Sequence, residues 1–210
     1  MDQYLTAAPV ASVLFALTLL VSFIAFYNEK MYDKFILHPY NVSRGQNVYT
    51  LITSGFIHAD LMHLFFNMFT FFFFSFTLEA MLGHWQFAVL YMVSMVLGDL
   101  PTVIKHKNDF WYRSLGASGA ISAVVFSYIL FQPFADMYLL FIPIGIPAIL
   151  FGILYLVYCS YASKRGIGNI NHDAHLFGGV CGIIITVLLR HDVLMDFIHA
   201  ISEKMQSFGH

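Results

Sequence analysis

The sequence contains six long stretches without a charged side chain. They are 26, 18, 19, 22, 27 and 16 residues long and cover 3–28, 61–78, 80–98, 114–135, 137–163 and 174–189. A helix needs about 20 mostly apolar residues to cross a bilayer, with a range of roughly 17–25. Five runs meet or approach this length, and the sixth continues into Arg190, whose long side chain can reach the membrane interface. The pattern predicts six transmembrane helices.

Composition excludes several other classes. Of 210 residues, 59% are hydrophobic and 10% are charged, whereas a soluble domain carries about 25% charged residues. An ordinary soluble domain and a disordered chain are therefore excluded. The net charge of −2 shows no basic surplus, so no nucleic-acid partner is expected. Cys159 and Cys181 lie inside apolar runs and are interpreted as small core residues, not as a disulfide framework or a metal cluster.

These runs predict a single-domain, all-α membrane protein. The first run lacks the positive residues that precede a cleaved signal sequence, so it is expected to remain as the first helix. The segment 29–60 mixes polar and apolar side chains and is expected to lie in the membrane interface. Helices are expected at about 8–27, 61–82, 84–102, 117–133, 146–162 and 174–190.

The orientation in the membrane is predicted from charge. The loops after the odd-numbered helices carry Lys30, Lys34, Arg44, Lys105, Lys107, Arg113, Lys164 and Arg165. The opposite side carries only Arg190 and Lys204. Because Lys and Arg favour cytoplasmic loops, this bias predicts that the odd-numbered loops face the cytoplasm.

A serine opens the fourth run. Ser118 stands in Gly116-Ala117-Ser118-Gly119, and a lone serine of this kind is usually a small residue that lets two membrane helices approach. The alternative is a nucleophile at a helix start, where flanking glycines admit a substrate. The hydrolase elbow Gly-x-Ser-x-Gly is only partly matched, so the motif alone is weak.

A histidine opens the sixth run. A membrane histidine is often an interhelical hydrogen-bond partner or a metal ligand, but its pKa near 6.5 also suits a general base. Gly178 and Gly182, which follow His175, form a Gly-x-x-x-Gly face that favours close helix packing. If this face packs on the fourth helix, Ser118 and His175 come within reach of each other.

Two more polar residues share one face of the second helix. His63 and Asn67 are four residues apart, and His58 precedes them. They could form a buried polar patch between helices, or they could be two donors aimed at a developing oxyanion. His63, Ser118 and His175 all lie near the starts of even-numbered helices, which begin on the same side of the membrane.

In combination these motifs resemble the rhomboid intramembrane serine proteases, over about residues 10–190. The resemblance implies a six-helix rhomboid-like bundle with an interfacial first loop. The motifs that carry it are His58-x4-His63-x3-Asn67, Glu79-x3-Gly83, Gly116-Ala117-Ser118-Gly119 and Ala174-His175-x2-Gly178-x3-Gly182.

The resemblance also implies a mechanism. Ser118 would attack a peptide carbonyl and His175 would take its proton, without a third, orienting carboxylate. His63, Asn67 and the Ser118 backbone N–H would stabilise the oxyanion. Structural support would come from His58, Gly116, Gly119, Gly178 and Gly182. No metal or cofactor is expected. The implied partners are the lipid bilayer and transmembrane protein substrates, and the expected location is the bacterial inner membrane.

Some positions depart from the family pattern. Tyr49-Thr50 stands where many members have Trp-Arg, and Ser122 stands where some have a tyrosine that stacks on the base. Asp173 does not face His175 and is expected to cap the sixth helix. The common bacterial form places the odd-numbered loops outside, which is opposite to the charge bias.

Three alternatives compete with this hypothesis. A zinc-dependent intramembrane protease could use His58, His63, His172, Asp173 and His175 as ligands, but His-Glu-x-x-His is absent from the sequence. A catalytically inactive rhomboid-like binding factor would typically have lost Ser118 or His175, and both are present. A small transporter would predict an inverted repeat or paired charges in mid-membrane, and neither is visible in the sequence.

Overall fold

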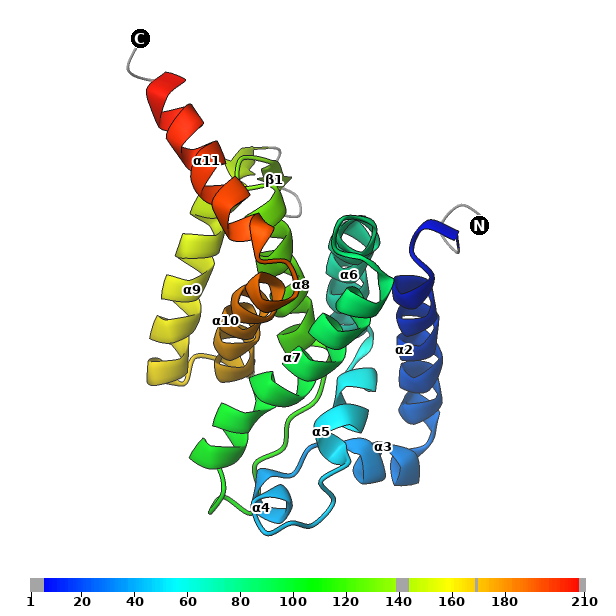
Figure 1. Cartoon of the computed structure of the whole chain (residues 1–210). Helices are drawn as coiled ribbons and strands as arrows, with labels where there is room; N and C mark the ends of the chain where they lie inside the picture. Colours follow the sequence, from blue (N-terminus) through cyan, green and yellow to red (C-terminus); the bar gives the residue numbers. More distant parts are fainter. Residues whose placement is uncertain (1–5, 139–143, 169, 208–210) are drawn as a thin grey trace.

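Six helices form the main body of the molecule (Figure 1), at the six places expected from the sequence. They are α2 (Pro9–Tyr27), α6 (Leu61–Leu82), α7 (His84–Lys105), α8 (Ser118–Phe131), α9 (Ala148–Arg165) and α10 (His172–Leu189). The structure is a computed structural model and describes residues 6–138, 144–168 and 170–207. Helices α2, α6, α7 and α10 are long and apolar enough to cross a membrane, and α8 is apolar but shorter. The membrane class is confirmed, while the count of six spans stays a prediction.

Helix α8 is the central helix of the bundle. Each of its residues from Ala120 to Ser127 is buried, and it contacts α6, α7, α9 and α10. A helix that is apolar on all sides is expected to be enclosed by others in this way. This position places Ser118, at the first turn of α8, inside the bundle.

Helices α8 and α10 touch through their backbones. A Cβ added to Gly178 would lie 2.2 Å from the carbonyl oxygen of Gly119, and one added to Gly182 would lie 2.4 Å from that of Ala123. Only a hydrogen fits at these two places, which permits the close approach typical of small residues between membrane helices. The Gly-x-x-x-Gly face of α10 therefore lies directly against α8.

A buried carboxylate joins α2 to α6. Glu79 is fully buried near the end of α6, and its two oxygens accept hydrogen bonds from the backbone N–H groups of Val10 at 3.0 Å and Ala11 at 2.6 Å. These N–H groups belong to the first turn of α2, where the helix itself provides no acceptor. Gly83 follows with a φ of 106° and ends α6.

The first loop contains short helical segments. They are α3 (Glu29–Phe35), α4 (Pro39–Val42), α5 (Thr50–Thr53) and the 3₁₀ turn η1 (Ser54–Phe56). Tyr49-Thr50, which differ from the family pattern, lie in this loop. Thr50 is buried and its hydroxyl donates to the Asn47 carbonyl at 2.7 Å, whereas Tyr49 is exposed.

A pair of short strands and a helix after residue 190 were not predicted from the sequence. Strands β1 (Asp136–Tyr138) and β2 (Gly145–Pro147) pair antiparallel between α8 and α9, so the protein is not purely helical. Helix α11 (Asp192–Ser207) continues beyond residue 190 and projects away from the bundle (Figure 1). The strands are only three residues long, so the all-α membrane class is unaffected.

Candidate active site

A cavity of about 530 Å³ opens between the helices, and its walls are mostly aromatic and aliphatic. Its polar wall includes Asn67 of α6, Ser118 of α8, Tyr155 of α9 and His175 of α10. The structure thus brings together three of the four residues expected to do chemistry, from three different helices. The fourth, His63, lies beside this group, against the turn that precedes Ser118.

Gly116 shapes the turn that leads into Ser118. Its φ is 111°, a conformation that residues with a side chain rarely adopt. Its N–H donates to the Ser54 carbonyl at 2.9 Å, and an added Cβ would lie 2.7 Å from Cε1 of His63. Both the backbone conformation and the neighbouring imidazole therefore require glycine here.

His58 connects this turn to α2. The Ala117 N–H donates to its Nε2 at 3.5 Å, so the neutral ring carries its hydrogen on Nδ1 and donates to Ser22 Oγ at 2.9 Å. The Ser22 hydroxyl in turn donates to the Phe56 carbonyl at 2.9 Å. Burial, followed by the charge of His63, lowers the pKa of His58 to about 3. The ring is therefore neutral and holds the residue before Ser118 in place.

His63 is oriented by two neighbours. The Ala59 N–H donates to its Nδ1 at 3.5 Å, and its ring stands edge-to-face with that of His58, with 4.9 Å between the ring centres. Because Nδ1 accepts, the hydrogen of the neutral ring is on Nε2, the nitrogen that lies against Gly116. A donor is thus directed at the turn before Ser118.

Asn67 lies one turn further along α6. Its Nδ2 donates to the His63 backbone carbonyl at 2.9 Å. An amide group has two hydrogens to donate, and this bond uses one of them. Since Asn67 also lines the cavity, the second hydrogen can serve a bound group.

Tyr155 supports His175 and was missed in the sequence. Its hydroxyl lies 3.1 Å from Nδ1 of His175 and 3.0 Å from the Ser122 hydroxyl, and the two rings are parallel to within 10°. The resemblance implied that some members have such a tyrosine one turn after the nucleophile, at the position on α8 where this chain has Ser122. Here α9 supplies the tyrosine, and Ser122 holds its hydroxyl.

The spacing of residues along α9 could have revealed this face. Tyr155 belongs to a series of otherwise small residues that follow one another at intervals of three or four, which is the spacing of one helical face. The residues on this face are Ala148, Gly152, Tyr155, Cys159 and Ala162, of which all but Tyr155 are buried. A single tyrosine among small residues on one helical face thus indicates that this face packs against the interior of the bundle.

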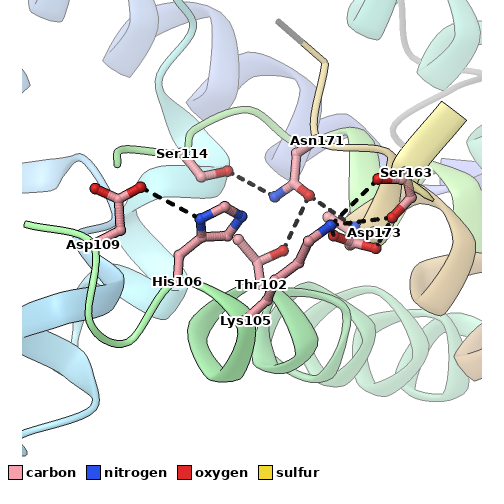
Figure 2. A network of polar contacts seen from close by, with 9 residues as sticks. Thr102, Lys105, His106, Asp109, Ser114, Ser163, Asn171 and Asp173 are labelled. Carbon is pink, nitrogen blue, oxygen red and sulfur yellow. Dashed lines mark hydrogen bonds and ion pairs between the residues drawn. The ribbon is translucent and has the colours of Figure 1, made fainter. Parts of the chain in front are cut away.

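Asn171 positions the start of α10 (Figure 2). Its Oδ1 accepts from the Ala174 N–H at 3.1 Å and from the Thr102 hydroxyl at 3.0 Å, and its Nδ2 donates to Ser114 Oγ at 2.9 Å. These bonds tie the first turn of α10 to α7 and to the segment that leads into Ser118. His175, one turn further on, is held relative to Ser118 by this network.

The expectation that Asp173 caps this helix was wrong, because Asn171 is the cap. Asp173 lies inside the first turn and pairs with Lys105 of α7 at 2.6 Å. It also accepts a hydrogen bond from the Ser163 hydroxyl of α9 (Figure 2). Its carboxylate thus connects three helices at the end of the bundle.

The five residues considered as zinc ligands fall into separate places. His63 lies beside Gly116 and His58 beside Ala117, whereas Asp173 pairs with Lys105 and accepts a hydrogen bond from Ser163. His172 and His175 do lie close to a third possible ligand, the buried Cys159 of α9, and the ligand atoms of these three all lie within 4.8 Å of one another.

Comparison with known proteins identifies the family. Residues 45–192 match the Rhomboid domain. The chain is 29% identical over 180 residues to "RHOMBOID-like protein 12, mitochondrial" of Arabidopsis thaliana, covering 79% of this chain and 53% of that protein. It is 33% identical over 141 residues to "Putative rhomboid protease YdcA" of Bacillus subtilis, covering 66% and 65%.

A third relative is "Rhomboid protein 1, mitochondrial" of Saccharomyces cerevisiae, at 30% identity over 147 residues, covering 64% of this chain and 40% of that protein. The matches thus span between 40% and 65% of the length of these relatives. The Rhomboid match includes the stretch from His58 to Gly182, within which all the candidate site residues lie. The chain belongs to the rhomboid family.

Proposed function

We propose that this protein is an intramembrane serine endopeptidase that cleaves transmembrane protein substrates in or near their membrane helix. The observation that carries the proposal is that Ser118, His175 and Asn67 line one cavity between apolar helices. A nucleophile, a base and an oxyanion donor are the groups that acyl transfer requires.

His175 would act as the base through Nε2, because Tyr155 already contacts Nδ1. As Ser118 Oγ attacks the peptide carbonyl, its proton moves to Nε2, and the imidazolium then gives that proton to the leaving amine. In the second half, a water molecule attacks the acyl-enzyme and His175 takes a proton from it. His175 then returns that proton to Ser118 Oγ as the bond between Oγ and the acyl group breaks. Tyr155 takes the orienting position that a carboxylate has in the soluble triad.

The oxyanion would be stabilised by donors from two helices. The Ser118 N–H lies at the first turn of α8, where backbone N–H groups have no partner within the helix. Nε2–H of His63 and the second N–H of Asn67 would add to it. Donors of this kind act on the charge that develops in the transition state.

The substrate would approach from the side, within the membrane. The cavity is lined by aromatic side chains that suit an apolar segment, among them Phe66, Phe69, Phe73, Phe74 and Phe151. A helical substrate hides its carbonyls in hydrogen bonds, so it must unwind before Ser118 can attack. Helix-breaking Gly or Pro residues near the cut are therefore expected to favour cleavage.

The protein is an integral membrane protein, and we place it in the bacterial inner membrane. The alternative is a mitochondrial membrane, since two relatives have names that say so. The charge bias and the common bacterial topology predict opposite orientations in the membrane. Reporter proteins fused at residue 207 and in the 106–113 loop would show which of these segments faces the cytoplasm.

Fluorophosphonate labelling of the purified protein tests this proposal. Ser118→Ala should abolish labelling. Ser94→Ala, which removes another buried hydroxyl on α7 outside the cavity, should leave it intact. Labelling that survives in Ser118→Ala would assign the nucleophile elsewhere. A wild-type protein that neither labels nor cleaves would favour the inactive binding factor.

A further inference from the structure

Three side chains that can bind a metal lie close together, and one of them is the candidate base, His175. Cys159 comes from α9, and His172 and His175 lie one turn apart on α10, which packs beside α9 (Figure 1). The ligand atoms of the three lie within 4.8 Å of one another. Cys159 is 1% exposed and His172 is 5% exposed, so these two are buried, whereas His175 borders the cavity.

The hydrogen bonds of His172 leave one nitrogen directed inward without a partner. Its Nε2 lies 3.2 Å from the Ile167 carbonyl, which can only accept, so Nε2 carries the hydrogen and Nδ1 carries the lone pair. Among the described residues, Nδ1 is buried and has no hydrogen-bond partner. A metal-bound histidine characteristically donates its other N–H to a carbonyl in this way. Without a metal or another partner, a buried nitrogen lone pair such as that of His172 Nδ1 lowers the stability of the fold.

The ligand set selects the type of metal. One thiolate and two imidazoles suit Zn²⁺, whereas Mg²⁺ and Ca²⁺ require oxygen ligands. Zn–N bonds of about 2.0–2.1 Å and a Zn–S bond of about 2.3 Å place the ligand atoms of a tetrahedral site roughly 3.3–3.6 Å apart. Small side-chain rotations would therefore close the present spacing. As the Zn–S bond forms, the Cys159 thiol releases its proton to solvent.

We propose that Cys159, His172 and His175 bind Zn²⁺, and that zinc held there inhibits the protease. This regulation rests on the proposed function, because His175 is both a ligand and the base. Bound through Nε2, zinc occupies the lone pair that would accept the Ser118 proton. Bound through Nδ1, it displaces the Tyr155 hydroxyl and makes the ring a weaker base. In either geometry the nucleophile loses its proton acceptor.

Direct binding is measured first, in Ser118→Ala protein, so that the result does not depend on proteolysis. Co²⁺ serves as a coloured substitute for Zn²⁺, and a cobalt–thiolate charge-transfer band is expected. The band should disappear in Cys159→Ala and persist in Cys181→Ala, which removes the other free, half-buried cysteine. Zn²⁺ should also raise the melting temperature through linkage. A band that survives in Cys159→Ala would overturn the site.

Inhibition is then measured as the ratio of rates with and without Zn²⁺ for each variant, so that changes in basal rate cancel. The Zn²⁺ concentration for half-inhibition should rise by at least about 10-fold in Cys159→Ala and in His172→Ala, and should stay unchanged in Cys181→Ala. EDTA should leave activity equal or higher. Equal zinc sensitivity in all variants, or activity lost in EDTA and restored by Zn²⁺, would contradict the proposal.

The two parts of the account fail separately. If the cobalt band depends on Cys159 but no variant cleaves any substrate, the metal site stands and the protease proposal fails. If cleavage depends on Ser118 but the band is absent, the protease proposal stands and the zinc site fails.

Discussion

The Tyr155 hydroxyl lies 3.1 Å from Nδ1 of His175, and the two rings are parallel to within 10°. This contact fixes the tilt of the imidazole from the side opposite to Nε2. Tyr155→Phe keeps the ring and removes the hydrogen bonds of the hydroxyl to His175 and to Ser122. The bond that orients His175 is worth about 0.5–1.5 kcal/mol, so kcat should fall about 2- to 12-fold. Tyr155→Ala should cost more, because the stacking is lost too.

The matched control is Tyr161→Phe on the same helix, where the side chain is 55% exposed. Its kcat should equal that of the wild type. If Tyr155→Phe also kept the wild-type kcat, Tyr155 would have no role in orienting the base.

The contact between α8 and α10 provides the second prediction. Gly178→Ala would place a methyl group 2.2 Å from the Gly119 carbonyl, so the helices must separate. Overpacking of this kind costs about 1–3 kcal/mol, and Ser118 should move away from His175. We expect a lower melting temperature and weaker fluorophosphonate labelling per folded molecule.

Gly98→Ala on α7 is the control, because its added Cβ would lie 3.4 Å from the Ala174 carbonyl. That contact is tight but needs only a small adjustment. If Gly178→Ala were as well tolerated as Gly98→Ala, the close approach of the two helices would not be what positions Ser118 relative to His175.

The third prediction concerns His63 and Asn67, the proposed oxyanion donors. Removal of one such donor costs about 10²–10³ in kcat in a soluble serine protease. Asn67→Ala should cost less than this, because His63 and the Ser118 N–H remain. His63→Ala should also lower kcat, since Nε2 of His63 lies against Gly116.

Melting temperature and kcat measured on both variants separate catalysis from packing. A purely structural role predicts a lower melting temperature with an unchanged kcat per folded molecule. That result would remove the residue from the catalytic group.

The buried His58 predicts a pH dependence of stability. Its pKa in the folded protein is about 3, below the ordinary value of about 6.5 in an unfolded chain. The unfolded chain therefore binds more protons at acidic pH. The stabilising contribution of neutral His58 is complete above about pH 6.5 and is lost as the pH falls towards 3.

The measurement is the free energy of unfolding in detergent between pH 6.5 and pH 4.5. The wild type should lose about 1 kcal/mol per pH unit more than His58→Gln, which cannot titrate. Parallel pH profiles for the two proteins would show that His58 does not remain neutral in the folded state.

Much of the fold was predictable because lipid imposes simple rules on sequence. The uncharged run 61–78, followed by Glu79-x3-Gly83, predicted a helix over about 61–82, and α6 has those bounds. The Asp60 side chain accepts from the His63 N–H at the start of α6. Uncharged runs gave the places of the other long helices. Helix α11 was missed because its charges, such as Asp196 and Glu203, interrupt any uncharged run although the helix is amphipathic.

The sequence predicted that Ser118 and His175 come close together, and both line the same cavity; whether they are the nucleophile and the base stays a prediction. The contacts made by residues from distant segments could not be predicted. Ser118 and His175 stand in local motifs. Tyr155 is 20 residues from His175, and no local pattern connects the two. Asn171 and Asp173 are both residue types that cap helices well, so the sequence alone did not decide which of them caps α10. In the structure Asp173 instead contacts Lys105 and Ser163, which come from other helices.

The central claim is that Ser118 cuts a membrane helix, and cleavage in liposomes tests it most directly. Wild-type protein is reconstituted with a single-pass substrate that carries Gly or Pro within its membrane helix, and the fragments are sized by mass spectrometry. The account predicts one cut within or beside the helix, slower cleavage when Leu and Ala replace the helix breakers, and none with folded Ser118→Ala. Undiminished cleavage by Ser118→Ala would contradict it.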